Sequence, residues 1–296
     1  MATLLILKER IHLKAGRFDP LGALLIAVGM AGLTAGLSFG QEQGWTSPLI
    51  LTLLLLGLLA LVTLPFVEQR VRNPVIVLAL LRNRVFDSSM VSLLFSFLAL
   101  FAVSFLMPFY LEHLRGFSTL QAGLLLTPVP VTLALIAPLS GSLADRIGSR
   151  WLTAGGLMIA CIGLVLMGQL NEHSSLFAIV WRLILTSIGQ GLFQAPNNSA
   201  LIGSAPRHLQ GSASGFLATA RTMGQSMSMA LAGAIFVGLG GATAGNFLVT
   251  HPTSVHLTGY QQTFDTAFQA TFLACATIAA IGILACLVRG KEERRK

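Results

Sequence analysis

Long uninterrupted apolar runs divide this chain, and they limit the folds open to it. Eight such runs cover residues of about 20–40, 48–67, 86–111, 120–143, 151–170, 175–203, 212–238 and 266–288. A run of about 20 apolar residues suits a helix that crosses a bilayer, whereas the strands of a membrane β-barrel are shorter and alternate in polarity. The pattern therefore predicts an all-α polytopic membrane protein with about eight transmembrane helices.

The composition agrees with a membrane protein and narrows the functional classes. Hydrophobic residues make up 54% of the chain and charged residues only 10%, whereas charged residues make up about 25% of an ordinary soluble domain. The net charge of +8 would suit nucleic acid, but the basic residues lie in short connections between apolar runs, so we expect no nucleic-acid partner. The cysteines and histidines lack the spacing of metal ligands, so we expect no metal site and no cofactor.

Basic residues are divided unequally between the two sides of the predicted membrane. The connections on one side contain a single basic residue, Arg115, whereas those on the other side contain sixteen. Arg182 and Arg221 lie inside apolar runs and are not counted. The sixteen are Lys8, Arg10, Lys14, Arg17, Arg70, Arg72, Arg82, Arg84, Arg146, Arg150, Arg207, Arg289, Lys291, Arg294, Arg295 and Lys296. Because basic connections stay on the cytoplasmic side, we expect both termini to be cytoplasmic, in the inner membrane of a bacterium. The stretch of about 244–265 is then an external loop.

The apolar runs and their connections predict five regions. These are a cytoplasmic N-terminal segment (1–17), a two-helix transmembrane hairpin (18–67), a cytoplasmic interfacial linker (68–85), a six-helix bundle (86–288) and a basic cytoplasmic tail (289–296). The linker contains an apolar stretch at 75–81, which is too short to span and which we expect to lie at the membrane surface.

The connection GSLADRIGSR, from Gly141 to Arg150, places an acid, two arginines and two glycines between two apolar runs. A charged connection this short holds two helix ends close together and keeps Asp145 and Arg146 near the lipid headgroups. We expect Asp145 near a helix N-terminus, where the dipole favours a carboxylate, and paired with a basic group in one conformational state. The alternative is a static surface ion pair, worth about 1 kcal/mol or less.

This decapeptide resembles the loop signature of the major facilitator superfamily, a glycine followed by Leu-Ala-Asp-Arg, a second glycine and a basic pair. Ser149 stands where the signature has the first member of that pair. Five further stretches resemble segments of its 14-helix drug:proton antiporters: GRFDPLG at 16–22, GQEQGW at 40–45, NPVIVLALLRNRVF at 73–86, GFSTLQAGLLLTPVP at 116–130 and GSASGFLATARTMGQSMSMAL at 211–231. The resemblance implies the C-terminal six-helix bundle of a facilitator fold with an extra helical hairpin.

The resemblance also implies a function, namely proton-coupled efflux of small amphipathic compounds or drugs by alternating access. Its gating loop would comprise Gly141, Asp145, Arg146, Gly148 and Arg150. In such transporters another six-helix bundle comes first, so we expect that N-terminal half to be missing here. The expected partners of this chain are the lipid bilayer, a small-molecule substrate and that missing half. The alternative is a truncated or half-transporter subunit without transport activity of its own.

A membrane-embedded enzyme is the third alternative and the least expected one. The sequence contains no HExxH zinc motif and no phosphate-binding loop, and it shows no pair of carboxylates inside a predicted span. These arrangements would supply a general base, a metal or a phosphate site.

Polar residues inside the apolar runs mark a candidate cavity or substrate path. Gln190, Gln194 and Asn197 share one helix face by their spacing, which suits either a cavity wall or hydrogen bonds between helices. Arg221 lies about ten residues into its run, roughly 15 Å from the start. It either faces a cavity or partner or extends to the membrane surface, and both interpretations stay open. Arg182 is nearer the outer end, where extension to the surface is preferred.

Overall fold

The computed structural model describes residues 20–44, 46–68, 80, 83–251 and 257–288. The predicted N-terminal segment, the apolar stretch at 75–81 apart from Leu80, and the basic tail lie outside these residues. The described part is helical and contains no strand. The prediction of an all-α polytopic membrane protein is therefore confirmed, while the division into five regions stays a prediction.

The helices follow the predicted runs closely. In chain order they are α2 (Pro20–Gln43), α3 (Pro48–Glu68), α4 (Arg84–Phe109), the π-helical turn η2 (Tyr110–Leu114), α5 (Thr119–Leu126), α6 (Pro128–Ile147), α7 (Ser149–Met167), α8 (Leu176–Ser204), the 3-10 turn η3 (Arg207–Leu209), α9 (Gln210–Gly238), α10 (Gly241–Thr250) and α11 (Leu257–Leu287). Within the described residues, five helices are long and apolar enough to cross a membrane, and a sixth follows if the bent pair α9 and α10 is one span. The apolar parts of α2 and α3 are shorter, so eight spans remain a prediction.

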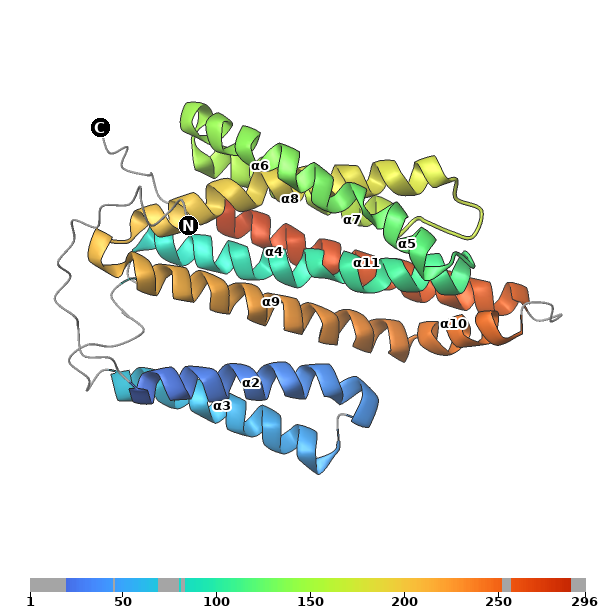
Figure 1. Cartoon of the computed structure of the whole chain (residues 1–296), viewed down its shortest axis with the longest axis horizontal. Helices are drawn as coiled ribbons and strands as arrows, with labels where there is room; N and C mark the ends of the chain where they lie inside the picture. The colour runs from blue at the N-terminus through green and yellow to red at the C-terminus, as the bar shows by residue number, and fades with distance from the viewer. Residues whose placement is uncertain (1–19, 45, 69–79, 81–82, 252–256, 289–296) are drawn as a thin grey trace, which may run out of the picture.

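The long helices lie side by side and nearly along one axis (Figure 1). Helix α4 packs against α9 and α11, α11 also packs against α7, and α8 lies between α6 and α7. The α2–α3 hairpin lies along α9 through α2, apart from the other helices (Figure 1). This arrangement buries one face of α4 and α11. It leaves the segment formed by α5 and α6 largely uncovered, because only 6% of its apolar 18-residue window is buried.

Two helix pairs approach so closely that only glycine fits between them. A Cβ atom on Gly156 of α7 would lie 2.7 Å from the backbone nitrogen of Phe193, and one on Gly189 of α8 would lie 2.3 Å from that of Ala160. In the hairpin, a Cβ on Gly32 would lie 2.8 Å from the Leu53 carbonyl oxygen. Small residues at helix crossings in membranes permit this backbone contact.

The prediction of an external loop at 244–265 is wrong over most of its length, because most of these residues are helical. Residues Gly241–Thr250 form α10, and α11 already begins at Leu257. The chain turns at Gly240, whose φ of +80° lies in the left-handed region, and α9 and α10 meet at a 70° bend. The aromatic ring of Tyr260 stacks on that of Phe247 with 3.9 Å between centroids. This contact joins α10 to the first turns of α11, two stretches that the search for apolar runs did not include.

Candidate functional site

The charged decapeptide is almost entirely helical, and not the connecting loop that its composition predicted. Residues 141–147 form the last two turns of α6, and only Gly148 lies between α6 and α7. Gly148 has φ +89° and ψ 145°, and its N–H donates to the Ala144 carbonyl oxygen at 2.9 Å. A side chain disfavours this conformation, so a single glycine ends one helix and starts the next. The expectation of two helix ends held close together is thereby met with a shorter connection.

Asp145 does not lie at a helix N-terminus, as we expected, but in the last turn of α6. Its carboxylate and the neighbouring Arg146 are exposed, and Asp145 forms no salt bridge within the described part of the chain. Arg146 suits this position because a helix C-terminus favours positive charge. A gating or static pairing of Asp145 thus has no counterpart in this conformation, and its gating role stays a prediction.

Arg150 connects the start of α7 to the end of α11. One of its terminal guanidinium nitrogens donates to the carbonyl oxygen of Leu287, and the guanidinium lies 5.5 Å from the ring centroid of Trp151. A carbonyl in the last turn of a helix has no partner within that helix. Arg150 therefore satisfies a helix end, which makes it a structural contact at the predicted cytoplasmic side.

A cavity of about 420 Å³ opens between α6, α8 and α9. Its wall combines three polar side chains with small and apolar ones. The lining residues are Leu133, Ala134, Ala137, Gly191, Gln194, Ala195, Asn198 and Arg221. Gly191 permits the close approach of α8 to α6 beside this space, because a Cβ there would lie 2.8 Å from Ile136 of α6. The size falls within the usual range for small-molecule sites.

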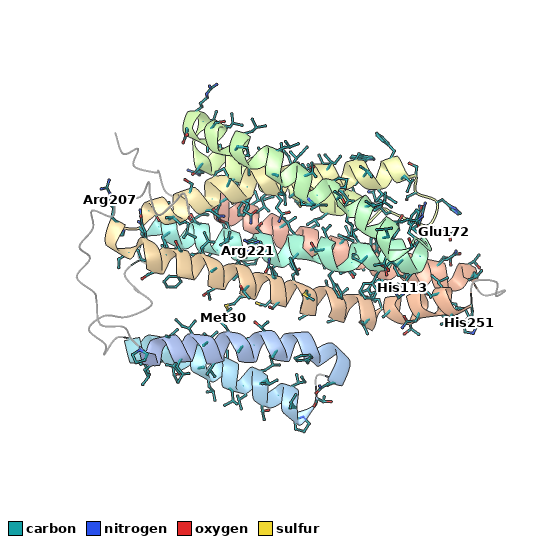
Figure 2. All side chains as sticks on the ribbon, viewed as in Figure 1. Met30, His113, Glu172, Arg207, Arg221 and His251 are labelled. Carbon is teal, nitrogen blue, oxygen red and sulfur yellow. The ribbon has the colours of Figure 1, made fainter. Side chains whose placement is uncertain are left out.

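Arg221 is the only charged residue that lines this cavity. It follows Gln210, the first residue of α9, by 11 positions, or about 16 Å of helix, and it lies away from both ends of the bundle (Figure 2). Its guanidinium carbon is 5.3 Å from the ring centroid of Phe97 on α4. The side chain is exposed, lines the cavity and lies over the Phe97 ring. Its part in a substrate path stays a prediction, beside the alternative of extension to the membrane surface.

The polar residues of α8 face two different directions. Gln194 and Asn198 line the cavity, whereas Asn197 is fully buried against α4. The Asn197 amide nitrogen donates to the Ser89 carbonyl oxygen at 3.0 Å, and Ser92 donates its hydroxyl to the Asn197 side-chain oxygen at 3.3 Å. Asn197 is therefore a packing contact between helices. Asn198 was not among the predicted cavity residues, because its spacing from Gln194 is four positions and the predicted face included Asn197, three positions after Gln194.

The two remaining candidates lie outside this cavity. Gln190 is half-buried one turn before Gln194 but is not among the lining residues. Arg182 lies near the start of α8, and its guanidinium carbon is 5.3 Å from the ring centroid of the adjacent Trp181. The lining residues on α6 are apolar, so nothing in their chemistry marked them in the sequence.

A second polar cluster, formed by Arg115, Tyr110 and the turn that contains Glu172, lies at the end of the bundle opposite Arg207 (Figure 2). Arg115, just after η2, donates to the carbonyl oxygens of Glu172 and Ser174 in the turn between α7 and α8, at 2.6 Å for Ser174. The Tyr110 hydroxyl donates to the Asn171 carbonyl oxygen at 2.7 Å. These bonds tie the end of α4 to that turn. The only salt bridge among the described residues joins the neighbours Glu172 and His173.

The described residues contain no group of three or more His, Cys, Asp or Glu side chains arranged to hold a metal ion. The sequence GLSFG at 36–40 has the GxSxG spacing of a hydrolase nucleophile, but it lies inside α2. A nucleophile of that class needs a strand-to-helix turn. The cavity between α6, α8 and α9 presents one cation, two amides and an apolar wall, which suit the binding of a small molecule.

Comparison with known proteins agrees with a membrane transport fold. The family model described as the Major Facilitator Superfamily matches residues 18–229, more than half of the chain. The "Uncharacterized transporter YebQ" of Escherichia coli (strain K12) is 38% identical over 219 residues, which cover 73% of this chain and 47% of that protein.

A second relative and a solved structure extend this similarity. The "Multidrug resistance protein Stp" of Mycobacterium tuberculosis (strain CDC 1551 / Oshkosh) is 28% identical over 233 residues, which cover 79% of this chain and 43% of that protein. The chain thus spans about half the length of the curated relatives it matches. A crystal structure of a bacterial homolog to the human lysosomal transporter Spinster, inward-facing and occupied, shares the fold with a TM-score of 0.56 at 16% identity, covering 91% of this chain and 66% of the other.

Proposed function

Because this chain belongs to the major facilitator superfamily, we propose that it carries the substrate cavity of a secondary transporter that exports small amphipathic compounds in exchange for protons. Such transporters move a substrate by rocking helix bundles around a site near the middle of the membrane. The observation that carries the proposal is the cavity between α6, α8 and α9, with Arg221 away from both ends of the bundle. The name of the multidrug resistance relative supports drug-like compounds as substrates.

The membrane orientation belongs to the same proposal. Arg207 lies at one end of the bundle, and His113, Glu172 and His251 lie at the other (Figure 2). The end with Arg207 also contains the exposed Arg146, in the last turn of α6. The excess of basic residues supports a cytoplasmic position for this end, in the inner membrane of a bacterium and with both termini on the same side.

Transport by the purified chain in liposomes tests the proposal. A proton gradient is imposed across the membrane, and the movement of a cationic dye, ethidium, and of an anionic dye, fluorescein, is followed with and without a protonophore. We expect gradient-dependent flux of at least one dye, abolished by the protonophore. Liposomes without protein measure the leak, and flux equal to that leak contradicts transport by this chain alone.

The second candidate function is a transporter part that binds substrate but needs another helix bundle for transport. The coverage of about half of each relative supports it, because two bundles are needed to rock around one site. Co-reconstitution with the first half of YebQ tests this candidate. Flux that appears only in the mixture supports it, and equal absence of flux with and without that half contradicts it.

A further inference from the structure

The cavity contains an arginine without a counter-charge. Within the described part of the chain, no carboxylate forms a salt bridge with Arg221, and none of the other lining residues is charged. The face of the Phe97 ring lies near its guanidinium, which stabilises a cation without neutralising it. An ionised side chain at membrane depth is costly unless it pairs, so this position favours an anion in the cavity.

The second polar group with an unmet requirement is Asn198. Its side-chain oxygen is buried, and no hydrogen-bond donor reaches it among the described residues. Gln194 lies one turn earlier on the same wall and adds an amide that both donates and accepts. A buried acceptor left unpaired is unfavourable. Because this oxygen has almost no exposed area, the acceptor that a ligand meets on this wall is the Gln194 amide.

The remaining wall determines the shape and polarity of the ligand body. Leu133, Ala134 and Ala137 of α6 face the polar residues of α8 and α9 across the cavity. Small side chains leave a surface on which an apolar body packs, as in most ligand sites. Arginine also presents its donors as a planar fork that matches a carboxylate or phosphate with two parallel hydrogen bonds.

We propose that the cavity binds an amphipathic organic anion, with its carboxylate or phosphate on Arg221, a hydrogen-bond donor toward Gln194 and its apolar body against α6. This substrate class rests on the proposed transport function but is tested by binding alone. A cationic compound of the same shape should bind more weakly, because it would meet the like charge of the unpaired guanidinium.

The test is equilibrium binding to the purified chain in nanodiscs of uncharged phosphatidylcholine. The probes are 2-naphthoate, the neutral 2-naphthamide and the cationic 2-naphthylmethylammonium, which share one apolar body. Hydrogen bonds to a charged group correspond to roughly a tenfold change in affinity or more. We therefore expect a Kd at least about tenfold lower for naphthoate than for naphthamide, and the weakest binding for the ammonium compound.

Three variants separate the role of Arg221 from general damage. Arg221→Gln should raise the naphthoate Kd about tenfold or more while leaving that of naphthamide within about twofold, and Arg221→Glu should reverse the preference toward the ammonium compound. Arg207→Gln removes an exposed arginine outside the cavity and should change neither Kd. Equal binding of naphthoate and naphthamide to the unmodified chain overturns the proposal, as does an equal effect of Arg221→Gln and Arg207→Gln.

The source of the anion is resolved by repeating the measurement in nanodiscs with phosphatidylglycerol. An unchanged naphthoate Kd identifies a water-soluble anion as the ligand, and a raised Kd that Arg221→Gln abolishes identifies the lipid phosphate. Selective naphthoate binding without dye flux supports the anion site and contradicts transport by the chain alone. Dye flux without any preference for naphthoate supports transport and overturns the anion site.

Discussion

Replacing Gly156 by alanine tests the contact that positions the cavity-bearing helix α8 against α7. The added Cβ would lie 2.7 Å from the Phe193 backbone nitrogen, whereas ordinary contacts of this kind begin at 3.4 Å. The neighbour is backbone and cannot rotate away, so the two helices must separate by several tenths of an ångström. Overpacking of a tight contact costs about 1–3 kcal/mol, and a rigid backbone neighbour favours the upper half of this range.

The assay is thermal unfolding of the detergent-solubilised protein, followed by tryptophan fluorescence. Two of the chain's three tryptophans lie on the helices concerned, Trp151 on α7 and Trp181 on α8. Because 1 kcal/mol changes Tm by about 2–4 °C in a large domain, a cost of about 2–3 kcal/mol should lower the Tm of Gly156→Ala by roughly 4–12 °C.

Gly155 provides the matched control, since it is the adjacent residue on the same helix. A Cβ on Gly155 would meet no atom within 4 Å, and alanine favours a helix over glycine by about 0.5–1 kcal/mol. Gly155→Ala should therefore leave Tm unchanged or raise it. If both variants lower Tm equally, or if Gly156→Ala has no effect, the close packing of α7 against α8 is refuted.

Three further substitutions address the ends of the bundle. Arg115→Gln removes hydrogen bonds to two carbonyl oxygens and should lower the free energy of unfolding by about 1.5–3 kcal/mol, whereas Arg207→Gln, at an exposed turn, should not; equal stability of the two variants in thermal unfolding contradicts this. Gly148→Ala imposes a Cβ at φ +89° and should destabilise the protein by about 1–3 kcal/mol, in contrast to Gly141→Ala, which meets open space within α6. Asp145→Asn alters an exposed side chain without a salt bridge among the described residues, so Tm should stay the same; if Asp145 takes part in gating, dye flux should fall at least about fivefold, and unchanged flux rules out that role.

The sequence determined the class of fold because the constraint is local. A backbone inside lipid must satisfy its own hydrogen bonds, and a helix does so within one segment. Apolar runs therefore predicted the positions of α4, α7 and α8 to within a few residues. The same argument failed at 244–265, where α10 and the first turns of α11 are helical without being strongly apolar. Their stability depends on contacts such as that of Phe247 with Tyr260, which no single run reveals.

Only the tertiary structure decided which polar residues meet in a cavity. Asn197 and Asn198 are neighbours in sequence, yet one packs against α4 and the other lines the cavity. A rotation of about 100° per residue separates them, and which of the two faces the cavity depends on where α4 and α6 lie around α8. For Arg221, the sequence supplied the depth within its run, but the positions of Phe97 and the cavity decided its direction. Segment-level hydropathy is thus a property of the chain, whereas a binding surface is a property of how several segments pack.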